Sequence, residues 1–126
     1  MALSNSQYNA VMRGYEERQR LQRRAMEARV REVYSKIPQI QELDRQLSTR
    51  AADCARRVLG GDTRAREHLK EELADLKEQK RTLLKSAGFP ADYMELRYDC
   101  PDCQDTGYVN GKRCHCFERQ RLNILY

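Results

Sequence analysis

The sequence predicts a mainly α-helical protein: three long helices, the second and third forming a hairpin, and then a small knuckle with a short β-hairpin. Charged residues make up 34% of the 126 residues and hydrophobic residues 40%, with no Trp and two Phe. Apolar residues recur at helical spacing to about residue 86, and four of the five cysteines then follow between residues 100 and 116. Such a chain buries a narrow helical seam rather than a wide core.

The first helix is predicted from Ser4, a helix-capping residue with its capping-box partner Gln7, to about Lys36. Its apolar stripe fades between residues 16 and 24, where only Leu21 is apolar, so we expect the helix to leave the body of the domain there. The stripe before that point has the spacing i, i+3, i+4, i+7 and consists of Tyr8, Val11, Met12 and Tyr15. We expect it to be exposed and to bind a partner; the alternative is that it packs on the second and third helices.

Pro38 ends the first helix and suits the first turn of a second helix, which is predicted over residues 39–59. Gly60-Gly61 ends it, and Asp62 is the expected N-cap of a third helix that extends to about Ser86. The short link makes the two helices antiparallel neighbours. Their expected seam consists of Ile40, Leu43, Leu47, Ala51, Cys54 and Val58 on the second helix and Leu69, Leu73, Leu76, Leu83 and Ala87 on the third. The stem of Lys80 is expected to cover the gap in that seam.

The cysteine segment has the spacing of a metal site. Cys100 and Cys103 form a Cys-x2-Cys turn, and Cys114 and Cys116 follow ten residues later. Asn110-Gly111 between them is typical of a two-residue β-hairpin turn, which would return the second pair to the first. Four thiolates would then surround one ion, and Zn²⁺ suits them best.

His115 lies between the last two cysteines and is the alternative ligand, giving three Cys and one His. Either set is closed, so the metal is expected to be structural and the site not catalytic. Asp99, Asp102 and Asp105 are interpreted as turn formers and hydrogen-bond acceptors around the site.

These patterns predict a helical domain over residues 1–88 and a zinc-binding knuckle over 89–126, leading into a linker. Aromatic and apolar residues at the junction are expected to pack the knuckle onto the helices: Phe89, Tyr93, Met94 and Leu96. Cys54 is interpreted as a small core residue and His68 as exposed. The expected location is the cytoplasm, because no export, lipidation or membrane-spanning pattern is present and clustered cysteines favour metal over disulfides.

The net charge of +5 is concentrated in residues 1–36, which hold eight Arg or Lys and four Glu. A basic first helix can bind single-stranded nucleic acid, with Tyr8 and Tyr15 stacking on bases. The arginines concerned are Arg13, Arg18, Arg20, Arg23, Arg24, Arg29 and Arg31. The alternative is a solvated helix face of mixed charge.

The segment from Tyr98 to Tyr108, the later run from Gly111 to Phe117 and the charged helices before them resemble the amino-terminal domain of bacterial DnaC/DnaI-type replicative helicase loaders. The resemblance covers nearly the whole chain and is most specific from Ala87 onward. It implies an adaptor that docks onto the hexameric DnaB-type helicase, with no small-molecule substrate of its own. Members of this family carry an AAA+ ATPase domain after the knuckle; this sequence has no Gly-x4-Gly-Lys-Ser/Thr phosphate loop, so the chain itself is expected not to be an enzyme.

A further alternative is an RNA-polymerase regulator of the DksA/TraR type, which also joins a helical hairpin to a zinc knuckle. That pattern usually has two Cys-x2-Cys pairs, whereas the second pair here is Cys-x-Cys.

Overall fold

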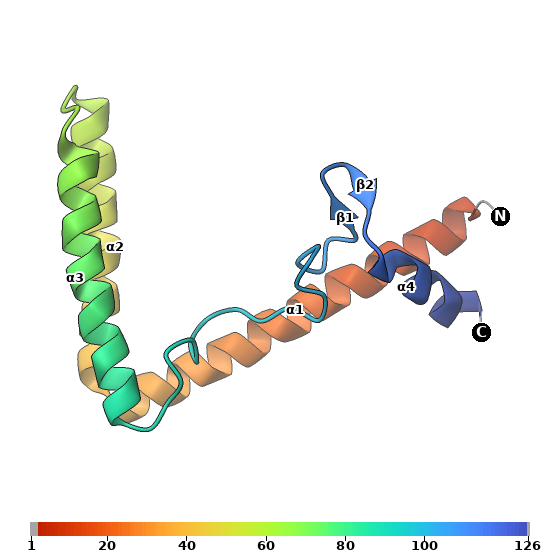
Figure 1. Cartoon of the computed structure of the whole chain (residues 1–126), viewed down its shortest axis with the longest axis horizontal. Helices are drawn as coiled ribbons and strands as arrows, with labels where there is room; N and C mark the ends of the chain where they lie inside the picture. Colours follow the sequence, from red (N-terminus) through yellow and green to blue (C-terminus); the bar gives the residue numbers. More distant parts are fainter. Residues whose placement is uncertain (1–2, 126) are drawn as a thin grey trace. The chain divides into compact units, whose positions relative to one another are not determined.

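The computed structural model describes residues 3–125 and is mainly helical, as predicted (Figure 1). Its elements are α1 (Asn5–Lys36), α2 (Pro38–Leu59), α3 (Ala65–Ser86), β1 (Tyr108–Val109), β2 (Lys112–Arg113) and α4 (Cys116–Leu125). The three long helices and the β-hairpin are confirmed. Helix α4, which extends through the last described residues, was not predicted from the sequence.

Packing groups the chain into two compact units. One consists of Met1–Ala28 and Glu95–Tyr126, and the other of Arg29–Met94. The beginning of α1 therefore belongs with the cysteine segment, and its end belongs with α2 and α3. The expected domain boundary between residues 88 and 89 stays a prediction.

The helix ends follow the local signals of the sequence. At the start of α1 the Gln7 amide donates to Ser4 Oγ at 3.2 Å, and the Ser4 amide donates to Gln7 Oε1 at 2.9 Å, which completes the capping box. Ile37 leaves the helical region ahead of Pro38, with φ −132° and ψ 78°. After α3, Gly88 takes a φ of +88°, which glycine adopts at little cost.

The start of α3 differs from the prediction. Asp62 does not cap this helix, which begins at Ala65 and follows Arg64. The Asp62 carboxylate instead accepts the Arg64 amide at 3.0 Å, two residues away, and so closes the turn that precedes the helix.

The core of residues 29–94 lies where the last turns of α1 meet the first of α2 and the last of α3. Its buried members are Val33, Ile37, Ile40, Leu84 and Met94. Leu84, which was not among the expected seam residues, is buried here, whereas Ala87, which was, is exposed. Phe89, Tyr93 and Met94 pack against this helical core, as expected of the residues that join the segment from residue 89 onward to the helices, whereas Leu96 is exposed.

Asp44 forms a polar centre between the helices of this unit. Its carboxylate accepts a hydrogen bond from the Tyr34 hydroxyl on α1 and pairs with Lys80 Nζ on α3 at 2.8 Å. The two charged side chains are only 22% and 24% exposed. Lys80 is thus accommodated in the seam by an ion pair as well as by its stem.

The other unit is built around the cysteines. Val11 and Tyr15 of α1 are buried together with Phe117 of α4 and the four cysteine side chains. Its strands pair antiparallel, with Tyr108 opposite Arg113 and Val109 opposite Lys112. Within residues 3–125, no helix has the length and hydrophobicity that crossing a membrane requires.

Candidate metal centre

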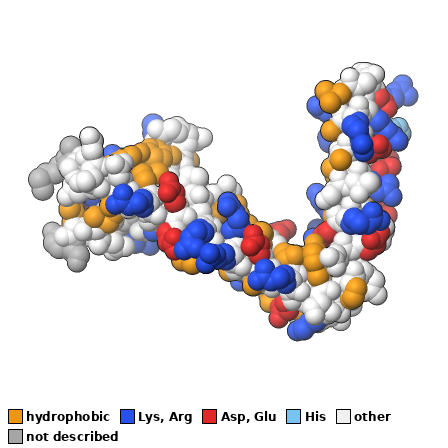
Figure 2. Space-filling view, turned by 180° about the vertical axis from the view of Figure 1, so that it is seen from behind, with side chains coloured by type: hydrophobic (Ala, Val, Ile, Leu, Met, Phe, Trp, Pro, Cys, Tyr) orange, Lys and Arg blue, Asp and Glu red, His pale blue; other side chains and the backbone are white. Residues whose placement is uncertain are grey.

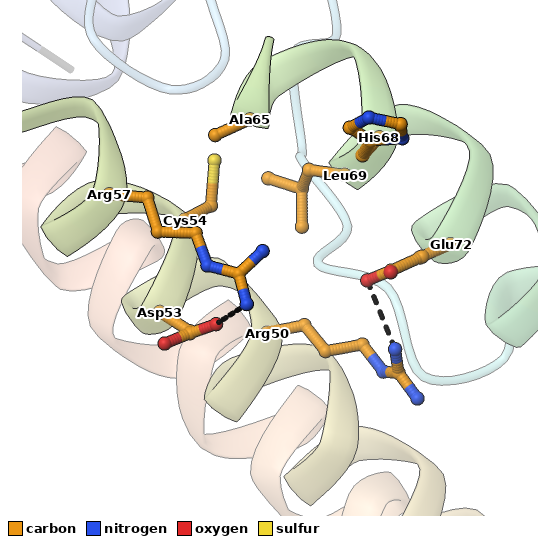
Figure 3. A pocket seen from close by; sticks show the side chains of 8 residues that line it. All are labelled: Arg50, Asp53, Cys54, Arg57, Ala65, His68, Leu69 and Glu72. Carbon is orange, nitrogen blue, oxygen red and sulfur yellow. Dashed lines mark ion pairs between the residues drawn. The ribbon is translucent and has the colours of Figure 1, made fainter. Parts of the chain in front are cut away.

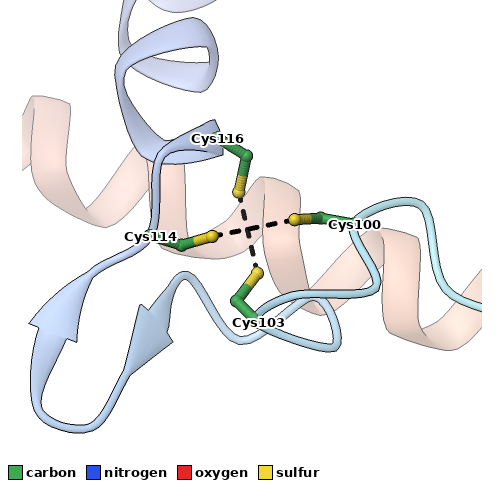
Figure 4. Close-up of side chains that lie close together, drawn as sticks. All are labelled: Cys100, Cys103, Cys114 and Cys116. Carbon is green, nitrogen blue, oxygen red and sulfur yellow. Dashed lines mark hydrogen bonds between the residues drawn. The ribbon is translucent and has the colours of Figure 1, made fainter.

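Four cysteine sulfurs converge on one point in the first unit (Figure 4). The loop before β1 supplies Cys100 and Cys103, the end of β2 leads to Cys114, and Cys116 is the first residue of α4. All four sulfurs lie within 4.8 Å of one another, and the side chains are buried. The predicted convergence of the two pairs is therefore confirmed.

The spacing of the sulfurs fits a tetrahedral ion. Cys100 Sγ lies 3.7 Å from Cys114 Sγ, and Cys103 Sγ lies 3.6 Å from Cys116 Sγ. Four sulfurs each about 2.3 Å from a central ion would be about 3.8 Å apart. A disulfide would need about 2.05 Å, and all five cysteines are free thiols. The arrangement can hold a metal ion.

The β-hairpin brings the two cysteine pairs together because its turn has the required backbone. Asn110 and Gly111 have φ values of +53° and +80°, the left-handed pair of a type I′ turn. The Cys114 amide then donates to the Gly107 carbonyl at 2.8 Å, which closes the hairpin.

The cysteine loop is held from within by Asp105, whose side chain is only 1% exposed. Its two carboxylate oxygens accept the backbone amides of Asp99 and Cys100, each at 2.9 Å. Two amide donors satisfy this buried charge and fix the chain at the first ligand. The interpretation of Asp105 as an acceptor beside the site is confirmed.

The first helix reaches the cluster directly. The Tyr15 hydroxyl lies 2.9 Å from Cys116 Sγ, in buried surroundings. Tyr15 also stacks on Phe117, with ring centroids 6.2 Å apart. The guanidinium carbon of Arg18 lies over the Tyr15 ring, 4.4 Å from its centroid. A hydroxyl donor to a thiolate ligand lowers the charge that the ion must neutralise and orients the sulfur.

Two glutamines continue this contact along α1. Gln19 Nε2 donates to the Asp105 carbonyl at 2.6 Å, and Gln22 Nε2 donates to Asp99 Oδ1 at 2.7 Å. Neither glutamine is among the site residues predicted from the sequence, because those residues come from the apolar stripe alone. Their signal was present: 8, 12, 15, 19 and 22 continue one helix face at intervals of four and three.

The thiols are electrostatically unequal in the protein alone. A hydrogen bond from the Cys103 backbone amide lowers the pKa of the Cys100 thiol to about 7. Burial raises the pKa of the Cys116 thiol to about 12. A metal ion deprotonates coordinated thiols outright, so the buried position of Cys116 suits a sulfur whose charge a cation balances.

His115 lies at the edge of the cluster. Its side chain is 65% exposed, and Nε2 is 2.6 Å from Asp102 Oδ2 but 4.0 Å from Cys100 Sγ. The four buried sulfurs form a tetrahedral set without it, which favours the all-cysteine alternative. Cys100, Asp102 and His115 also lie close enough together to bring ligand atoms within 4.8 Å of one another.

The apolar stripe of α1 is not exposed, contrary to expectation. Val11 and Tyr15 are each 1% exposed, and Tyr8 and Met12 pack partly buried against the same cluster. The stripe covers the cysteine segment, neither projecting into solvent nor packing on α2 and α3. An amphipathic stripe shows that a helix face is buried, but several surfaces of one chain can bury it. Its predicted role in binding a partner stays a prediction.

Comparisons with models of protein families, with curated proteins and with solved structures found no match.

Proposed function

We propose that this chain is an adaptor domain of a bacterial helicase loader of the DnaC/DnaI type, docking onto a DnaB-type hexameric helicase. The observation that carries the proposal is the Tyr98–Phe117 segment, which resembles that family in sequence. Its four cysteines meet at one point, as a metal-held knuckle of that family requires. The charged helical segment that the resemblance includes also precedes the cysteines in the structure.

Within this proposal the ion is Zn²⁺ and its role is structural. Four thiolates are soft ligands of a kind that Zn²⁺ prefers in closed tetrahedral sites. Such a site leaves no coordination position for water or substrate. Coordination by the four cysteines would hold the cysteine loop against Tyr15 and Phe117 in one core. The metal would then stabilise the first unit, whose surface binds another protein.

Variants of the α1 stripe do not provide a clean test of helicase binding. Tyr15 contacts a cysteine sulfur and Val11 is buried, so replacing either residue would disrupt the fold of the knuckle. A loss of helicase binding in such a variant would not identify a contact with the partner. Other apolar side chains of the first unit are exposed, among them Leu21 at 52% and Leu122 at 43%. Leu21→Glu and Leu122→Glu are therefore informative variants.

Binding of the zinc-loaded chain to the replicative helicase of the same organism tests the proposal. Light scattering after gel filtration should show a complex with the hexamer, and circular dichroism should confirm that each variant is folded. A folded, zinc-loaded chain that does not associate with the hexamer at tens of micromolar would contradict the proposal. Full binding by both exposed-leucine variants would exclude those positions only.

A second candidate function is binding of single-stranded nucleic acid by α1. Lys and Arg side chains are visible along this helix, interspersed with acidic ones (Figure 2). Arg20 is paired with Glu17, whereas Arg13, Arg23 and Arg24 are exposed and form no ion pair within residues 3–125. Their charge is available to phosphates, and such binding should weaken steeply with salt. Absence of binding to a labelled oligo-dT at low salt would remove this candidate.

A further inference from the structure

The two sides of the α2–α3 seam differ near the connection between the helices. On one side, ion pairs bridge or border the seam (Figure 3). Arg50 of α2 pairs with Glu72 of α3 at 3.0 Å, and Arg57 pairs with Asp53 at 3.2 Å. The hollow between them is small, about 120 Å³. Paired charged side chains therefore fill most of the space on this side of the seam.

The other side of the same seam is an open apolar groove of about 570 Å³. Six apolar residues line it: Ala51, Cys54, Ala55, Val58, Leu59 and Leu69. The five on α2 fall at intervals of three and one, so they form one continuous helix face. Leu59 at its end is 88% exposed, more than any other large hydrophobic side chain in the described part of the chain.

The size of these side chains suits the approach of another helix. Ala51 and Ala55 are short, so a neighbouring backbone can come close to α2, while Val58, Leu59 and Leu69 offer larger side chains to interdigitate. From Ala51 to Leu59 the face is about 12 Å long at 1.5 Å per residue, enough for two turns of a bound helix. Hydrophobic side chains stand at the surface near the end of this hairpin, beside Lys and Arg (Figure 2).

The charge of the groove indicates what kind of helix binds. The remaining lining residues are Arg66 and Lys70, one turn apart on α3, and no acidic residue lines the groove. Neither cation forms an ion pair within residues 3–125, in contrast to Arg50 and Arg57 on the closed side. Two cations along one edge of an apolar groove complement carboxylates beside the apolar stripe of a partner helix.

We propose that this groove binds an acidic amphipathic helix of a partner protein. The partner's apolar residues, spaced i, i+3 or i+4, and i+7, lie against Val58, Leu59 and Leu69, and its Glu or Asp side chains pair with Arg66 and Lys70. The proposal requires neither the metal nor the helicase, since every residue of the groove belongs to the unit formed by Arg29–Met94.

A designed pair of labelled 20-residue peptides provides the test. Both carry Leu at the i, i+3, i+4, i+7 positions; one has Glu on the flanking positions and the other has Lys. Fluorescence anisotropy with the full chain should show micromolar binding of the Glu peptide, at least tenfold weaker binding of the Lys peptide, and weaker Glu-peptide binding at high salt.

Three variants locate the binding. Leu59→Glu places a carboxylate in the groove at an exposed position, and Lys70→Glu reverses the charge at its edge; each should weaken the Glu peptide at least tenfold. Lys77→Glu makes the same charge change on an exposed part of α3 outside the groove and should have little effect. Circular dichroism should show unchanged helix content in all three.

Several results would overturn the proposal. They are equal affinity for the two peptides, no binding of the Glu peptide at 1 mM chain, and full binding by folded Leu59→Glu. Self-association of the chain that Leu59→Glu abolishes would identify a second copy as the occupant instead.

Discussion

The Tyr15 hydroxyl and Cys116 Sγ lie 2.9 Å apart, although the two residues are 101 positions apart in the chain. Through this contact the first helix and the last of the four clustered cysteines share one buried core. Phe117, the residue after Cys116, stacks on Tyr15 in the same core. The cysteine knuckle is therefore completed by a helix from the opposite end of the sequence.

Removing the hydroxyl should weaken metal binding. Tyr15→Phe keeps the ring but loses the hydrogen bond to the sulfur, and losing such a partner of a ligand typically lowers affinity about 10–100-fold. Competition with a chromophoric chelator would measure the change for Zn²⁺. Tyr8→Phe is the matched control, because its hydroxyl lies 2.7 Å from the Tyr108 hydroxyl and not from a sulfur. Equal losses in the two variants would show that the effect is general destabilisation.

A methyl group at Gly107 should disrupt the contact between α1 and the knuckle. A Cβ there would lie 2.9 Å from the Tyr15 ring, whereas one at Gly111 would meet nothing within 4 Å. Both residues have positive φ, +86° and +80°. Gly111→Ala should therefore cost about 1–2 kcal/mol from the backbone alone, and Gly107→Ala about 1–3 kcal/mol more from overpacking. Denaturant unfolding would measure the free energy of unfolding of both variants. Equal losses in the two would contradict close packing of the Tyr15 ring against Gly107.

Removing a bound metal should unfold one unit and leave the other. Four buried thiols make up much of the first unit's core, so chelation should expose the segment from residue 95 onward and the first turns of α1. The core around Ile40 and Leu84 contains none of these cysteines and should persist. Hydrogen exchange by segment, with and without chelator, would separate the two. Loss of protection throughout α2 and α3 would contradict independent stability.

The converse variant is Ile40→Ala. Ile40 is fully buried between α1, α2 and α3, and truncating such a residue costs about 2–5 kcal/mol. Denaturant unfolding should show the helical unit destabilised by that amount. Affinity for Zn²⁺ at temperatures where the variant remains folded should equal that of the unaltered chain. A large parallel loss of metal affinity would show that the two units unfold together.

Alkaline pH should destabilise the helical unit through Tyr34. Burial, together with the hydrogen bond to Asp44, raises the pKa of Tyr34 from 10.0 to about 12. The folded state therefore holds this proton more tightly than the unfolded state. The stabilisation is complete below pH 10 and is lost as the pH rises to 12. The free energy of unfolding of Tyr34→Phe should fall less steeply than that of the unaltered chain over this interval; identical slopes would contradict the assignment.

Local chemistry let the sequence alone determine the helices, their breaks and the cysteine cluster. The capping box at Ser4, the Pro38 break and the Asn110-Gly111 turn each act over a few residues, and each is present in the structure. The spacing of the cysteines also identified the four clustered thiols, because the short segments and the tight turn between them hold the four side chains close together. Asp62 shows the limit of such signals, since the same side chain caps either a helix or a turn.

Only the tertiary structure decided what the first helix covers. Its stripe of Tyr8, Val11, Met12 and Tyr15 fixed which face is buried, but the choice between solvent, the hairpin and the knuckle depends on contacts across about a hundred residues. Hydrophobic burial is non-directional, so periodicity identifies a face without naming its partner. The hydrogen bond between the Tyr15 hydroxyl and Cys116 Sγ supplies the missing direction, because such a bond forms only when its two atoms are close together and correctly oriented.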